Sequence, residues 1–127
     1  MSISVAEKLK NSKLVGVTQV DFSFFNAVAP QVFSDKAIYE CVGNDIAFIS
    51  QMGNQLFNYF NEADPSSQKL WYDALKLGCD SCVANCNTLI TQIPQDKPKG
   101  PDAKTVLQEL IVDCQAILAV IPVTKGS

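Results

Sequence analysis

The sequence predicts an all-α protein in which a long antiparallel helical hairpin and a C-terminal helix form a bundle-like arrangement. Apolar residues recur three and four positions apart over residues 34–61, 65–93 and 102–121, which is the period of a helix with one face in a core. Only residues 62–64 separate the first two of these segments, so the helices must fold back on each other as a hairpin over 34–93. A loop with three prolines, residues 94–101, precedes the last helix.

Composition excludes several classes of function for this chain, whose 127 residues are expected to form a single all-helical domain. It contains no histidine, which removes the commonest general base and the most frequent metal ligand. All ten basic residues are lysines, so no guanidinium is present to read phosphate or guanine. We therefore expect a protein that is not an enzyme, needs no cofactor and binds no nucleic acid.

The N-terminal segment, residues 1–13, has neither the apolar core of a signal peptide nor the length of a membrane span. We expect no membrane-spanning segment elsewhere in the chain. The protein is therefore predicted to be cytoplasmic, with its five cysteines reduced.

The apolar segment over residues 14–33 carries a single charge, Asp21, in twenty residues. Thr18 is placed to cap a helix over 20–28, and Pro30 is expected to end or kink that helix near Ala29. Alternating apolar residues in the same segment also fit a strand, so helix is favoured but not settled.

This apolar segment has two interpretations, either as part of the core of a compact monomer or as a surface that another subunit covers. We favour the second, because large exposed apolar patches are rare on monomers and the later helices already supply a core. The predicted assembly interface includes apolar residues of this segment and of the next helix: Val20, Phe22, Phe24, Phe25, Val28, Phe33, Ile46, Ile49 and Gly53.

Helix starts can be predicted at three further positions. Ser34 is expected to cap the helix to Asn61, Asp64 followed by Pro65 the helix to Ile93, and Asp102 the helix to Ile121. Glycines within these helices weaken them by about 1 kcal/mol each, and close approach of a neighbouring helix is the expected compensation.

Three cysteines, Cys79, Cys82 and Cys86, fall on one side of the second hairpin helix. They are a thiolate site for copper(I) or zinc, which would need Cys41 or Cys114 as a further ligand, a redox switch, or small apolar residues in a close-packed core. The last interpretation is favoured.

Two carboxylates, Asp45 and Asp113, fall among apolar residues of their helices. They either lie at the edge of the apolar face, in water or near a lysine, or are buried. In a chain without histidine, a buried carboxylate with a raised pKa is the group that can sense acid.

The start of the chain resembles the R-body structural proteins, also called the Reb or "killing trait" family. The resemblance rests on Val17-Thr18-Gln19-Val20-Asp21, the pair Ala29-Pro30 and Tyr39, and covers residues 14–58. Asp21 stands where the family tends to have asparagine. The resemblance implies a cytoplasmic bacterial protein that polymerises, alone or with a homologous subunit, into a coiled ribbon. Such ribbons extend on acidification and are associated with toxin delivery, in which the assembly contacts a target membrane.

These observations lead to one principal hypothesis and one alternative. The principal hypothesis is a non-enzymatic, self-assembling subunit of an R-body-like ribbon, which extends when carboxylates such as Asp45 and Asp113 are protonated. The alternative is a discrete helical bundle that binds copper(I) or zinc through the three cysteines.

Overall fold

The chain folds as an antiparallel bundle of helices, which confirms the all-α prediction. The computed structural model describes residue 7, residues 14–59 and residues 62–121. Over these residues the helices are α2 (Leu14–Val32), α3 (Lys36–Tyr59), α4 (Pro65–Thr91) and α5 (Gly100–Val120). The predicted N-terminal segment, apart from residue 7, lies outside the described residues.

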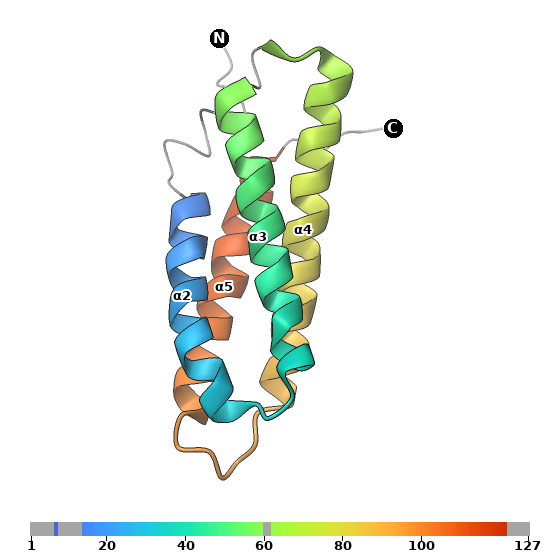
Figure 1. Cartoon of the computed structure of the whole chain (residues 1–127). Helices are drawn as coiled ribbons and strands as arrows, with labels where there is room; N and C mark the ends of the chain where they lie inside the picture. The colour runs from blue at the N-terminus through green and yellow to red at the C-terminus, as the bar shows by residue number, and fades with distance from the viewer. Residues whose placement is uncertain (1–6, 8–13, 60–61, 122–127) are drawn as a thin grey trace.

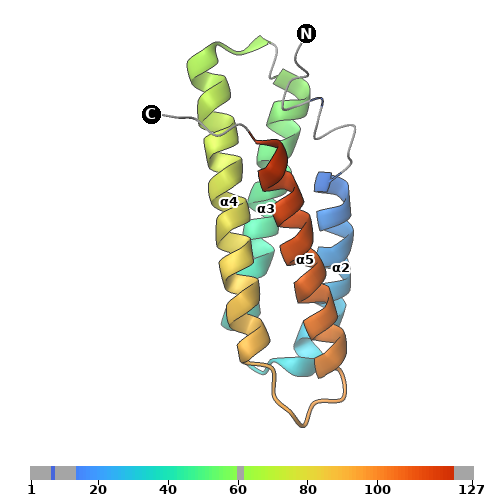
Figure 2. The ribbon, with the colours of Figure 1, turned by 180° about the vertical axis from the view of Figure 1, so that it is seen from behind.

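Each helix packs against two others, in the order α2, α3, α4, α5 and back to α2. Helices that follow each other in the chain run in opposite directions (Figures 1 and 2). Because α2 packs on α3 and α5, it lies diagonally opposite α4. The hairpin of α3 and α4 is longer than its partners and extends past α2 and α5 at the end where residues 62–64 lie (Figure 1). In the described part of the chain, no helix is both long and apolar enough to cross a membrane.

The apolar segment is one helix of this bundle and not a strand. It begins at Leu14, well before the predicted start, and continues past Pro30 to Val32. The predicted stop at Ala29 was wrong, because a proline in the last turn removes only one backbone hydrogen bond. The Phe33 amide still donates to the Ala29 carbonyl at 2.8 Å, and Val32 and Phe33 are buried in the core.

Helix α3 begins one residue later than predicted, because Asp35 and not Ser34 caps it. The Asp35 carboxylate accepts a hydrogen bond from the Ala37 amide at 3.0 Å, and its carbonyl accepts one from the Ile38 amide at 3.1 Å. An aspartate at this position accepts a hydrogen bond from an otherwise unpaired backbone amide. Its negative charge also interacts favourably with the partial positive charge at the N-terminus of the helix. The helix ends at Tyr59, and its predicted end at Asn61 lies outside the described residues.

The start of α4 confirms the prediction: the Asp64 side chain accepts a hydrogen bond from the Ser67 amide at 2.8 Å, and Pro65 is the first helical residue. By contrast, α5 begins at Gly100, so Asp102 lies in its first turn and is not the cap. The negative charge of Asp102 still stabilises the helix, because it lies near the partial positive charge of the N-terminal end. The C-terminal ends of α4 and α5 fall one or two residues before the predicted ones.

The core lies along the axis of the bundle, with contributions from every helix. Its largest fully buried side chains are Phe25, Val32, Val42, Ile46, Ile49, Leu56, Leu75, Leu89, Leu107, Leu110 and Ile117. Glycine allows the expected close approach of helices. A Cβ on Gly78 of α4 would lie 2.8 Å from the Phe48 ring of α3, and one on Gly43 would lie 3.2 Å from the Phe22 ring of α2.

Candidate functional site: a carboxyl pair between α2 and α5

The most unusual polar feature of the bundle is a pair of carboxyl groups, Asp21 of α2 and Asp113 of α5. Asp21 lies on the same face of α2 as Thr18, Phe25 and Ala29, which are fully buried, and its own exposure is only 8%. Asp113 precedes Cys114, a fully buried core residue, and is itself half-buried. The helical periodicity of both segments therefore brings two acidic side chains into one interface.

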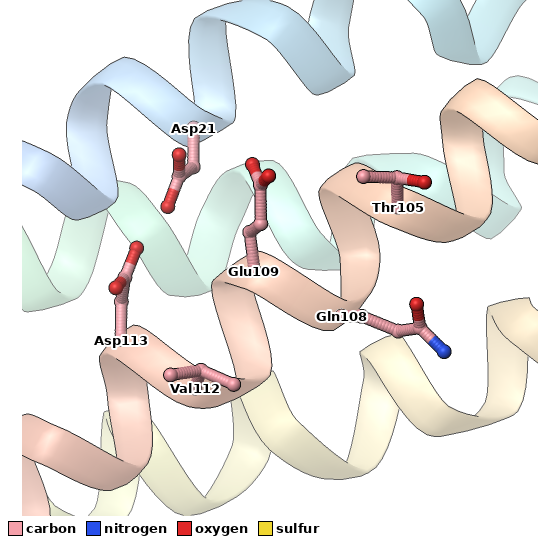
Figure 3. A pocket seen from close by; sticks show the side chains of 6 residues that line it. All are labelled: Asp21, Thr105, Gln108, Glu109, Val112 and Asp113. Carbon is pink, nitrogen blue, oxygen red and sulfur yellow. The ribbon is translucent and has the colours of Figure 1, made fainter.

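In each carboxyl group, one oxygen lacks the donor that normally accompanies a buried carboxylate. The Oδ2 atoms of both Asp21 and Asp113 are buried and have no hydrogen-bond partner within the described structure. Figure 3 shows the Asp21 side chain directed from α2 toward α5, where Asp113 and Glu109 point back at it. Buried polar groups without a partner are rare in proteins and commonly mark a functional feature.

Among the residues that the structure describes, those lining the shallow groove beside the pair carry no positive charge. They are three acidic residues, Asp21, Glu109 and Asp113, together with Thr105, Gln108 and Val112. Burial, followed by a hydrogen bond with Asp113 and the negative charge of Asp113, raises the pKa of Asp21 to about 7.

This arrangement can hold one proton between α2 and α5. When Asp21 is protonated, its hydroxyl can donate a hydrogen bond to Asp113 and join the two helices. When both groups are ionised, two negative charges repel each other across the interface. The geometry thus allows the protonation of Asp21 to affect the contact between α2 and α5.

The sequence predicted half of this pair. Asp113 was expected to be one of two acid-sensing carboxylates, and the structure places it in a half-buried, uncompensated position. Asp21 was missed as its partner. The available signal was the spacing of Thr18, Asp21 and Phe25, which puts the aspartate on the core face once the segment is read as a continuous helix.

Asp45, the other predicted acid sensor, has a different environment. Its carboxylate accepts hydrogen bonds from Ser81 Oγ at 3.0 Å and from Asn85 Nδ2 at 2.8 Å, both on α4. The Asp45 side chain is half-buried, and its hydrogen-bond donors are neutral groups of the neighbouring helix and not water or a lysine, as one interpretation of the sequence had it. The structure therefore assigns Asp45 the role of a polar link between α3 and α4.

The cysteines gather in the core, as the spacing of Cys79, Cys82 and Cys86 predicted. Cys114 of α5 joins them and all four are fully buried, whereas Cys41 is exposed elsewhere on α3. The sulfur atoms of Cys82 and Cys86 lie 3.9 Å apart.

The chemistry of these thiols favours packing over metal binding. The pKa of Cys86 is raised by a hydrogen bond with Cys82 and by burial, and that of Cys114 by a hydrogen bond with Cys79 and by burial. Metal ligation needs the thiolate, which these surroundings disfavour. Among the residues that the structure describes, no three cysteine or carboxylate side chains are placed to hold a metal ion. The described geometry thus fits small apolar side chains in a close-packed core.

Five residues of the predicted assembly interface lie within the core of the single chain: Phe25, Phe33, Ile46, Ile49 and Gly53. Phe25 and Phe33 pack on α3, where the Tyr39 ring meets both of them at centroid distances of 6.4 Å. Ile49 faces Gly78 of α4. Phe22 and Val28 are half-buried, and Val20 and Phe24 remain 54% and 60% exposed.

No protein-family model matches this chain, and no significant match was found among curated proteins or solved structures.

Proposed function

We propose that this chain is a non-enzymatic structural subunit that self-assembles into an R-body-like coiled ribbon in the bacterial cytoplasm and extends on acidification. The observation that carries the proposal is the Asp21–Asp113 pair, because it connects the helix of the apolar segment to the rest of the bundle through a contact that depends on a proton. The resemblance of residues 14–58 to the R-body family supports the same function. A role in toxin delivery and contact with a target membrane follow from that resemblance alone.

The acid response starts with the pKa of Asp21, which lies near 7 and well above the value of 3.8 for a free aspartate. Among the described residues, the charged groups that face Asp21 across the groove are Asp113 and Glu109 of α5, and none of these residues offsets its charge. Above neutral pH, repulsion between the carboxylates weakens the contact of α2 with α5. Below neutral pH, the protonated pair holds α2 in place.

A small change in every subunit is sufficient to change the length of a polymer. If protonation alters how α2 sits on α5 in each copy, the change repeats along the ribbon and accumulates over its length. Packed interfaces favour two discrete arrangements over continuous deformation, so the transition is expected to be sharp.

Sedimentation and negative-stain electron microscopy of the purified full chain test the proposal. Wild-type protein is expected to form ribbons at about pH 8, and Asp113→Asn, which removes one charge of the pair, is expected to change their pH response. Asp96→Asn is the matched control, because Asp96 is exposed in the loop before α5. A protein that remains a monodisperse monomer at neutral and at acidic pH would refute the proposal.

A further inference from the structure

Four of the five cysteines form one buried cluster between α4 and α5. Cys79, Cys82 and Cys86 follow each other on the core face of α4, and Cys114 of α5 meets them there. The sulfur atoms of Cys82 and Cys86 are 3.9 Å apart, and the Cys114 thiol is hydrogen-bonded to both Cys79 and Cys82. Thiols in contact are the groups that an oxidant can join as a disulfide.

Packing alone does not require cysteine at these positions. A buried thiol contributes to a core as a small apolar group, and alanine or valine can fill a similar space. The cluster differs from ordinary packing because its members contact one another across two helices that pack directly together. The removal of two thiol hydrogens would therefore join α4 to α5 by a covalent bond.

Helical geometry restricts which of these thiols can pair. Cβ atoms three or four residues apart on one helix are about 5–6 Å from each other, whereas a disulfide needs a Cβ separation of about 3.5–4.5 Å. A bond between Cys82 and Cys86 would therefore distort α4, although their sulfur atoms are in contact. Cys114 approaches from a neighbouring helix and is free of this fixed spacing. Every disulfide that leaves both helices intact thus includes Cys114.

We propose that Cys114 forms a disulfide with Cys79 or Cys82 and that this bond is a redox-sensitive lock that fixes α5 to α4. The bond closes a loop of about 35 residues, which contains the end of α4, the proline-rich loop and the start of α5. Because such a bond restricts the unfolded chain, the oxidised bundle resists unfolding more than the reduced one.

A peroxide is the oxidant in this step. One thiolate attacks a peroxide oxygen, the O–O bond breaks, and the hydroxide that leaves takes up the thiol proton as water, so that the cysteine becomes a sulfenic acid. The sulfur of the second cysteine then attacks the first, the S–O bond breaks, and the hydroxide released takes up the second thiol proton. Two thiols are thereby oxidised to one disulfide, and one peroxide is reduced to two water molecules.

The reaction depends on local opening of the bundle. In the closed core, a hydrogen bond with Cys114 and burial raise the pKa of Cys82, and a hydrogen bond with Cys79 and burial raise that of Cys114, so thiolate is scarce. Oxidation therefore proceeds through states in which α4 and α5 separate locally. The lock forms slowly, at a rate set by this opening, and then holds the two helices together.

Thiol counting after oxidation of the full chain tests the lock. Cys41→Ser removes the exposed thiol, and this variant is kept with hydrogen peroxide under native conditions until hydrogen exchange shows that its core amides have opened. Maleimide labelling in urea, read by mass spectrometry, is then expected to find two thiols where the untreated variant has four. Lys99 and Lys104 separate Cys114 from the cysteines of α4, so trypsin should release two peptides that the disulfide joins.

Two alanine variants in the same background provide a matched comparison. Cys114→Ala is expected to keep its three remaining thiols, whereas Cys86→Ala is expected to lose two of its three. Both positions are fully buried and undergo the same change, so a general loosening of the core would affect both variants alike. A urea midpoint that rises on oxidation and returns with dithiothreitol is expected only where Cys114 is retained.

Three results would overturn the inference. They are four intact thiols in the Cys41→Ser variant after its core amides have exchanged, a disulfide that joins two cysteines of α4 and leaves Cys114 free, and oxidation to sulfinic or sulfonic acids without linked peptides. The peptide map of the Cys41→Ser variant, taken from the monomer on a non-reducing gel, decides among these outcomes even where an alanine variant does not fold.

Discussion

Asp21 of α2 and Asp113 of α5 face each other across a helix–helix interface, each with a buried carboxylate oxygen that has no hydrogen-bond partner in the described structure. No described residue that lines the adjoining groove is positively charged. The interface is therefore most stable when one of the two carboxyl groups is protonated. Its stability falls as the pH rises, whereas that of an ordinary salt bridge falls when its carboxylate is protonated.

The sign of this dependence follows from the pKa of Asp21. The folded chain holds the proton up to about pH 7, whereas an unfolded aspartate releases it near 3.8. Between these values the folded state binds more protons, so this group's contribution to stability is complete below 3.8 and is lost as the pH rises through 7. A difference of about three pKa units corresponds to roughly 4 kcal/mol, which is an upper bound for one pair.

Asp21→Asn is expected to remove this dependence, because the amide is uncharged and can still donate a hydrogen bond to Asp113. The variant should be more stable than wild type by about 1–3 kcal/mol at about pH 8 and nearly equal to it at about pH 4. Urea unfolding followed by circular dichroism across this range measures the difference. A constant difference at all pH values would show that Asp21 does not titrate in the folded state.

Gly78→Ala is expected to destabilise the bundle even though alanine favours a helix. The new methyl group would lie 2.8 Å from Phe48 Cδ1 and 3.3 Å from Ile49 Cγ1, so α3 and α4 would have to separate. We expect a net loss of about 1–3 kcal/mol. Gly16→Ala is the control: nothing lies within 4 Å of its added Cβ, so a gain of up to about 1 kcal/mol is expected. Equal effects of the two substitutions would contradict the close packing of α3 on α4.

The five cysteines are expected to differ sharply in reactivity. Cys41 is exposed, while Cys79, Cys82, Cys86 and Cys114 are fully buried, and the pKa of Cys82 is raised by its hydrogen bond with Cys114 and by burial. Brief treatment of the native chain with a maleimide should modify one thiol, and mass spectrometry should locate it at Cys41. Rapid modification of all five thiols in the native state would contradict the described core.

Helical periodicity was sufficient to predict the bundle, because each apolar stripe repeats over several turns, but most helix ends differ from the predicted ones by one or more residues. Asp64 with Pro65 predicted a helix start correctly, since both residues act on the backbone locally. Pro30 was misleading because its effect depends on position within the helix, and the packing of Phe33 keeps the last turn folded.

The candidate site was harder to predict because it requires two residues 92 positions apart to meet, as the sequence numbers of Asp21 and Asp113 show. Each residue has a clear signal of its own, a charge on an apolar face. Which helices become neighbours is decided by the packing of the whole bundle, and a single sequence does not reveal it. For the same reason, Asp45 could not be separated from Asp113, because the donors Ser81 and Asn85 belong to another helix.

The most direct test of the central claim is the length of assembled ribbons in electron micrographs, measured for wild type and Asp21→Asn over about pH 8 to about pH 5. We predict that wild-type ribbons extend as the pH falls through about 7, where Asp21 takes up its proton, and that the variant is extended at every pH because its amide mimics the protonated group. Ribbons of both proteins that extend with the same midpoint would contradict the claim that this carboxyl pair is the acid-sensitive contact.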